Sequence, residues 1–202
     1  MSYGVNAPQG LQPYSDITGT PWNNQSTQYN IISGLATNIF TGDPVIFDGA
    51  GGITVATAGS NPTLGVFVGC KYLLNGTYAF SPYWPSGTVA SNAVAFVIDD
   101  PNVVFNIQAG GAGTPAVILS DFGNNVPFHA GAGSTTSGQS GFYLDSANFA
   151  GTSTLNLKVL AFTPVPGNPT PTVRNGTQGS FNNALVIINN HVYKGGTGTA
   201  GI

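Results

Sequence analysis

Glycine and proline interrupt this chain so often that it has little room for long helices. The 202 residues include 29 Gly and 14 Pro, and both residue types break helical segments. Short runs of β-branched and aromatic residues, which favour strands, lie between these breakers. Because 41% of the residues are hydrophobic, the composition favours a folded core over a disordered chain. We therefore expect an all-β protein.

The short apolar runs predict about ten strands, with turn signals roughly every 8–12 residues, which is typical of an antiparallel sandwich or barrel. Asn75-Gly76 separates two of these runs and is the residue pair of a type I′ hairpin turn. Residues 93–98 and 103–108 flank the turn-forming segment 99–102 and give the strongest hairpin-like pair. The candidate runs are 29–32, 38–40, 44–47, 53–56, 64–72, 77–80, 93–98, 103–108, 141–145, 155–162 and 184–188.

Residues 1–28 differ from the rest of the chain. They have neither helical nor strand periodicity, and three prolines keep the segment extended. Isolated apolar residues stand between polar ones, and we expect them to lie on a surface of this protein or of a partner; the alternative is a disordered terminus. We therefore predict an extended N-terminal arm, followed by a single β domain over 29–202 with a flexible C-terminal tail. The apolar residues of the arm are Tyr3, Leu11, Tyr14, Ile17 and Trp22.

Charge is scarce. Only 5% of the residues are charged, against a typical ~25%; there is no Glu, and the net charge is −3. Four basic residues cannot neutralise a long phosphate backbone, so we expect no nucleic-acid binding. The weak net charge gives little colloidal repulsion and favours self-association.

The chain has no apolar run of about 18 residues, so we expect no membrane span. The N-terminal MSYGVNAPQG lacks the basic and apolar parts of a signal peptide, which predicts synthesis in a cytoplasm. The single cysteine, Cys70, lies in an apolar run and is predicted to be a buried thiol.

Few residues are candidates for catalysis or metal binding. His129 and His191 stand outside any metal-binding or catalytic motif, and we expect each to be hydrogen-bonded or exposed. The adjacent acids Asp99 and Asp100 fit a turn, and a Ca²⁺ site is the alternative. We predict no catalytic residue, no metal site and no cofactor, and hence no enzyme.

Aromatic residues cluster at Tyr78, Phe80, Tyr83 and Trp84. Such residues fill a core or anchor a protein interface, where Tyr and Trp are enriched. Tyr83 and Trp84 are therefore candidate interface aromatics. The alternative is a sugar-binding site with Trp84 as its flat platform.

Four stretches, Ile39–Val45, Leu64–Cys70, Phe80–Pro85 and Ile187–His191, resemble patterns in small structural proteins of tailed bacteriophages. The resemblance covers roughly residues 30–110 and the end of the chain. Capsid decoration (cement) proteins are the best-known role among such proteins. That role implies binding to the major capsid protein on the outer head surface, often as a trimer, and a location in the virion after synthesis in the host cytoplasm.

The leading hypothesis is therefore a capsid decoration protein that stabilises the shell, with residues 1–28, and Tyr14 and Trp22 in particular, as the capsid-binding arm. The rival hypothesis is a carbohydrate-binding host-attachment module, like a tail-fibre domain, that uses Trp84 and Tyr83. A secreted adhesion domain is a third option, which the lack of a signal peptide disfavours.

Overall fold

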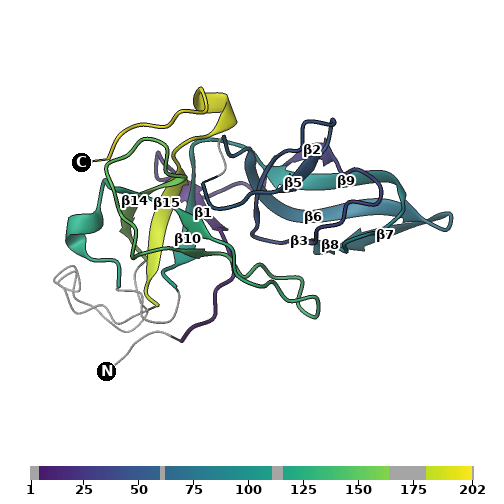
Figure 1. Ribbon diagram of the computed structural model, residues 1–202, viewed down its shortest axis with the longest axis horizontal. Coiled ribbons are helices and arrows are strands. Elements are labelled where there is room, and N and C mark those ends of the chain that lie inside the picture. The colour runs from purple at the N-terminus through teal and green to yellow at the C-terminus, as the bar shows by residue number, and fades with distance from the viewer. Residues whose placement is uncertain (1–4, 60–61, 111–115, 164–180, 202) are drawn as a thin grey trace.

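The computed structural model describes residues 5–59, 62–110, 116–163 and 181–201. This part of the chain forms fifteen strands and two short 3-10 turns, η1 (Leu119–Asp121) and η3 (Val192–Lys194). Every ladder between named strands is antiparallel. The prediction of an all-β antiparallel protein is therefore confirmed. The strands build two main sheets that lie side by side along the long axis of the molecule (Figure 1).

The first sheet has five strands in the order β1-β10-β15-β14-β11. Its alternating apolar side chains, such as those of Phe105 and Val186, enter a core that also receives Phe128 and Leu144 from a small two-stranded sheet of β12 and β13. The bounds are β1 Gln12–Asp16, β10 Val103–Gln108, β15 Asn183–Ile188, β14 Leu157–Phe162, β11 Asn125–Val126, β12 Phe128–His129 and β13 Tyr143–Leu144.

The second sheet has the order β2-β9-β6-β4-β5, with β7 paired to β6 outside this path. It covers a second core around Phe67, Val97 and Trp84, and Val55 packs against both cores. The short strands β3 and β8 pair beside it. The bounds are β2 Thr27–Asn30, β9 Ser91–Ile98, β6 Gly65–Leu74, β4 Pro44–Phe47, β5 Ile53–Val55, β7 Thr77–Ser81, β3 Ile39–Phe40 and β8 Tyr83–Trp84.

The segments 93–98 and 103–108 are both strands, but the predicted hairpin between them is wrong. The turn does form, and the Val103 amide donates to the Asp100 carbonyl. Beyond that turn, β9 enters the second sheet between β2 and β6, while β10 enters the first sheet between β1 and β15. Each strand finds two partners elsewhere, and the turn carries the chain from one sheet to the other.

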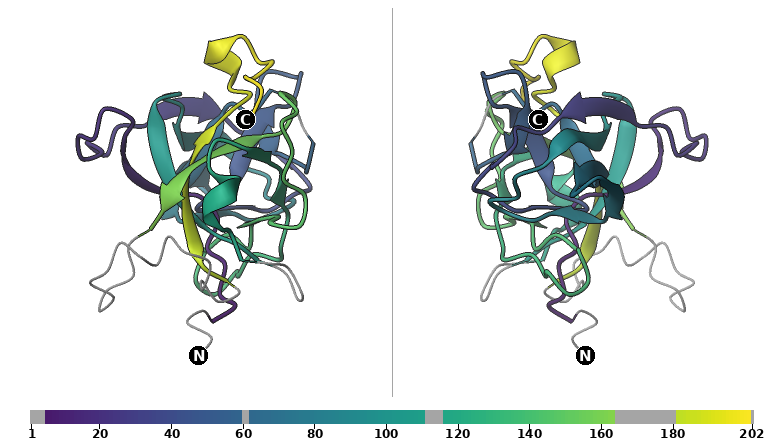
Figure 2. Two further views of the ribbon diagram at one scale, coloured as in Figure 1. Left: turned by 90° about the vertical axis from the view of Figure 1, so that its left-hand side faces the viewer. Right: turned by 90° about the vertical axis from the view of Figure 1, so that its right-hand side faces the viewer.

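The N-terminal segment lies on the protein's own surface as two edge strands. β1 pairs with β10 and β2 pairs with β9, so residues 12–30 run beside both sheets. The connection between β1 and β2 projects from the side of the molecule (Figure 2). Leu11, just before β1, is buried in the first core. The segment expected to be an extended arm thus contains β1 and the first two residues of β2.

The β6–β7 hairpin matches its sequence signal. Leu74 pairs with Thr77 across the two-residue turn, and Asn75 and Gly76 have φ values of 50° and 81°. Both positive values fit a type I′ turn, whose twist suits the flanking strands. This hairpin extends to the end of the molecule farthest from β14 (Figure 1).

The C-terminal residues, expected to form a flexible tail, make hydrogen bonds with the first sheet and its loops. Lys158 Nζ donates to the Ala200 carbonyl over 2.7 Å, and the Gly201 amide donates to the Gly151 carbonyl over 2.9 Å. The arm residue Tyr3 lies outside the described residues, and so do residues 164–171, whose four prolines are typical of a surface connection. No helix in the described part of the chain is long and apolar enough to span a membrane.

Candidate interaction surface

The outward side of the β6–β7 hairpin and the adjoining β9 carries an unusual number of apolar side chains. In β7, Tyr78 and Phe80 are 56% and 75% exposed. Pairing places Tyr78 opposite Leu73, and Phe80 opposite Lys71. Because residues opposite each other in a ladder share a face, these side chains form one surface. We call it the hairpin face, made of Lys71, Leu73, Tyr78, Phe80, Val94 and Phe96.

The opposite side of the same strands packs in the second core. Cys70, Tyr72 and Ala95 alternate with the residues of the hairpin face and are buried. The prediction of a buried thiol at Cys70 is confirmed, and this burial raises the pKa of the thiol to about 12. The strands are therefore apolar on both sides, unlike a half-solvated sheet with one polar face.

Lys71 is the only charged residue of the hairpin face. Its Nζ lies 5.9 Å from the centre of the Phe96 ring, within the range of a cation–π contact. An exposed apolar surface of this kind is typical of a protein–protein contact.

The predicted arm residues do not form one contact surface. Tyr14 and Ile17 are about half exposed, on β1 and just after it. Leu11 is buried, and Trp22 is partly buried against the first core. Tyr14 and Ile17 are therefore the members of the described set with a large apolar area open to a partner.

Tyr83 and Trp84 are less exposed than a pair of interface aromatics would be. Trp84 is fully buried, with its ring edge-to-face against Tyr72 at a centroid distance of 5.2 Å. Tyr83 is half-buried and stacks on Phe40 at 5.5 Å. Their place on β8, paired with β3, turns the indole inward. The exposed aromatics of this region are instead Tyr78 and Phe80.

Polar side chains join β2, the turn after β9, and η3. The Tyr29 hydroxyl donates to Asp99 Oδ2 over 2.7 Å and lies 2.7 Å from the Tyr193 hydroxyl. The Thr27 hydroxyl donates to the other Asp99 oxygen. Burial, together with these hydrogen bonds, raises the pKa of Tyr29. This network ties the C-terminal segment to the second sheet.

The two acids of the Asp99–Asn102 turn face different partners. Asp100 Oδ1 accepts from the Asn102 amide over 2.8 Å, whereas Asp99 accepts from β2. Asp100 therefore stabilises the turn, as expected, whereas the Asp99 side chain holds β2.

The histidines lie in contrasting environments. His191 is buried, its Nδ1 accepts from the Tyr193 amide over 3.1 Å, and burial lowers its pKa to about 4. His129 is exposed and stacks on Tyr143 at 4.8 Å. Both placements agree with the expectation of hydrogen-bonded or exposed histidines.

Comparison with known proteins yields no relative: no family model, no curated protein and no solved structure matches this chain.

Proposed function

We propose that this protein is a capsid decoration protein of a tailed bacteriophage, which binds the major capsid protein on the outer head surface and stabilises the shell. The observation that carries the proposal is the hairpin face, an exposed aromatic surface with a single charge at one end of the molecule. The resemblance of four sequence stretches to phage structural proteins supports the choice of partner. The proposal gives the protein a structural role in the virion and no catalytic one.

The energetics of the hairpin face suit such a role. Each well-buried aromatic anchor contributes up to about 1.5–3 kcal/mol before ordering costs. Tyr78 and Phe80 lie on a paired hairpin, so little backbone freedom remains to be lost on binding. Repetition of the contact over a capsid lattice, and trimer formation at a symmetry axis, would add avidity.

The direct test is co-sedimentation of the purified protein with heads of the phage that encodes it, prepared without this protein. An unrelated phage head is the control. We expect saturable binding at a fixed ratio to the major capsid protein, and a higher temperature of head disruption after binding. Lack of binding by protein that circular dichroism shows to be folded would contradict the proposal.

Tyr14 and Ile17 are a second contact set. Deletion of residues 1–28 is not a clean test, because it would remove β1, the buried core residue Leu11 and the first two residues of β2. The substitutions Tyr14→Ser and Ile17→Ser leave both strands in place. If this segment touches the capsid, the paired variant will bind heads more weakly while its unfolding midpoint in urea stays the same.

One observation favours the carbohydrate-binding alternative, though at a different place from the one expected. Trp84 is buried and cannot stack on a sugar. A small polar pocket of about 180 Å³ lies instead where the chain crosses between the sheets, with Trp22 beside Asn23, Asp16 and Asp99. Glycan-array binding that is lost in Trp22→Ala and kept in Trp84→Phe would support this alternative.

A further inference from the structure

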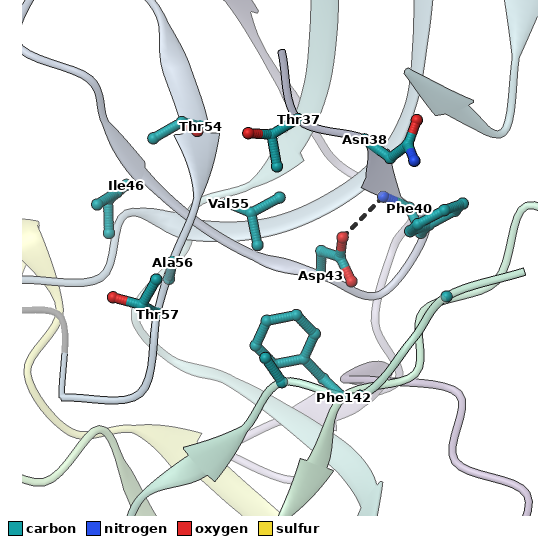
Figure 3. A pocket seen from close by; sticks show the side chains of 13 residues that line it. Thr37, Asn38, Phe40, Asp43, Ile46, Thr54, Val55, Ala56, Thr57 and Phe142 are labelled. Atoms are coloured by element: carbon teal, nitrogen blue, oxygen red, sulfur yellow. Dashed lines mark hydrogen bonds between the residues drawn. The ribbon is translucent and has the colours of Figure 1, made fainter. Parts of the chain in front are cut away.

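A cavity of about 500 Å³ opens between the β3–β5 region and the segment around residues 130–142. Its walls are mainly apolar, with Ile46 and Val55 from β4 and β5 and Phe142 from the opposite side (Figure 3). Thr37 and Thr57 are exposed members of the lining and place polar groups at the rim. The volume suits a small organic molecule, since ligand pockets commonly hold about 300–1,000 Å³.

Asp43 is the only ionisable residue among the described residues that line this cavity. It is 2% exposed. Its Oδ2 accepts from the Phe40 amide over 2.8 Å, while Oδ1 is buried and has no hydrogen-bond partner among the described residues. The Ser140 hydroxyl lies near enough to favour the ionised carboxylate, yet it makes no hydrogen bond to Oδ1.

A buried carboxylate oxygen without a partner is costly, because burial removes its water without replacing the hydrogen bonds. Burial raises the pKa of Asp43 to about 6, so the group is mainly ionised at pH 7.5. Oδ2 holds the turn over residues 40–43, in which the Asp43 amide also donates to the Phe40 carbonyl. The turn provides a hydrogen-bond donor for Oδ2 but none for Oδ1.

The wall opposite Asp43 is fixed by close packing. Gly133 lies so near the Phe40 ring that an added Cβ would collide with it, and an added Cβ on Gly131 would collide with the Gly141 carbonyl. Gly131, Gly133 and Phe142 thus form a closely fitted wall. The apolar walls are preformed, whereas Asp43 Oδ1 is covered by neighbouring atoms, so a ligand that reaches it must displace them.

We propose that this cavity is a binding site for a primary ammonium group carried on an apolar body, with Asp43 Oδ1 as the acceptor. An ammonium supplies the hydrogen-bond donor that Oδ1 lacks and the positive charge that balances the carboxylate. The aliphatic or aromatic part of the ligand would lie against Ile46, Val55 and Phe142. This inference does not depend on the proposed capsid role.

Two sources can supply this chemistry: a free amine, or a lysine side chain of a partner protein. The test is an NMR titration of the full chain at pH 7.5 with 2-phenylethylamine and, separately, with Nα-acetyl-lysine amide. The neutral alcohol 2-phenylethanol is the matched probe without charge. We expect the amide signals of Asp43, Ala56 and Phe142 to shift with at least one of the two amines, and the alcohol to bind more weakly.

Two variants in the cavity, with one control variant outside it, locate the site. Asp43→Asn keeps an acceptor for the Phe40 amide but removes the negative charge, and we expect a Kd about 10- to 100-fold higher for the bound amine. Asp100→Asn changes an exposed carboxyl outside the cavity and should leave the Kd unchanged. Thr37→Trp narrows the rim while Asp43 stays charged, and should also weaken binding.

Binding of phenylethylamine alone would support the proposal with a free amine as ligand. Binding of the lysine probe alone would support it with a partner's lysine as ligand. The proposal is overturned if neither amine shifts the cavity signals, or if folded Asp43→Asn binds the amine as tightly as the unmodified protein.

Discussion

The hairpin face and the Asp43 cavity are both apolar, yet they differ in shape and in the sign of their single charge. The hairpin face is open to solvent and carries Lys71 beside Phe96, whereas the cavity is recessed and carries Asp43. An open aromatic surface suits a flat partner such as another protein, while a concave site suits a small ligand. Shape and charge, rather than residue type alone, therefore distinguish the two candidate sites.

The two regions also contribute differently to folding. Phe142 in the cavity wall belongs to the first core, whereas Phe80 on the hairpin face is mostly exposed. Replacing one phenylalanine in each region therefore separates a role in stability from a role in binding.

The largest expected effect is on stability in the cavity wall. Phe142→Ala should lower the free energy of unfolding by about 3–5 kcal/mol, because it removes a buried ring and leaves a void. Phe80→Ala should change it by less than about 0.5 kcal/mol. Urea unfolding followed by circular dichroism measures both, and equal losses would remove the distinction between the regions.

Asp43→Asn should stabilise the protein at neutral pH. Because the folded-state pKa of about 6 lies above the ordinary 3.8, the folded state holds this proton more tightly, so the contribution of Asp43 to stability is greatest below pH 3.8 and is lost as the pH rises toward 6. The gap corresponds to about 2–3 kcal/mol. Urea unfolding from pH 3.5 to 7.5 should show this fall in the unmodified protein and a smaller fall in the variant; parallel curves would contradict the shift.

Amine binding in the cavity should strengthen as Asp43 ionises, whereas the stability of the unliganded protein falls. Lowering the pH from 7.5 to 5 protonates the Asp43 carboxyl and should weaken binding of 2-phenylethylamine by about tenfold, since the fraction ionised falls tenfold for each pH unit below the pKa. NMR titrations at the two pH values measure this. An affinity that is unchanged at pH 5 would show that another group holds the amine.

The smallest expected effect concerns the charge of the hairpin face. Lys71→Ala removes the contact with the Phe96 ring, which is worth about 0.5–1 kcal/mol at an exposed site. Thermal unfolding at low and high salt checks it, with Lys71→Met, which keeps an apolar stem and removes the charge, as the control. A loss well above 1 kcal/mol would mean that the Lys71 stem is part of the core.

Local signals in the sequence predicted many of the strands. The Asn75-Gly76 turn, the alternating run at 53–56 and the apolar run at 184–188 each specify a strand or turn within a few residues. These signals are short-range, so they locate strands but not their partners. The apparent hairpin of 93–98 and 103–108 failed for this reason, because pairing with distant strands decided which sheet each one joined.

The candidate sites were harder to predict. Trp84 and Phe80 look alike in sequence, and only the pairing of β8 with β3 turns one inward while β7 leaves the other exposed. The N-terminal prolines concealed β1, which forms at an edge where a proline is tolerated. Asp43 has the sequence context of a turn residue, and its cavity exists because residues 130–142 pack against it from far along the chain.

The central claim is that the hairpin face binds the capsid, and co-sedimentation of Tyr78→Ser/Phe80→Ser with heads lacking the protein tests it most directly. The matched control is Ile118→Ser/Leu119→Ser, which makes the same polarity change at two exposed apolar residues at η1. We predict a Kd about 100-fold higher for the hairpin variant, because two aromatic anchors are lost, and no change for the control. Equal binding of both variants and the unmodified protein would contradict the claim.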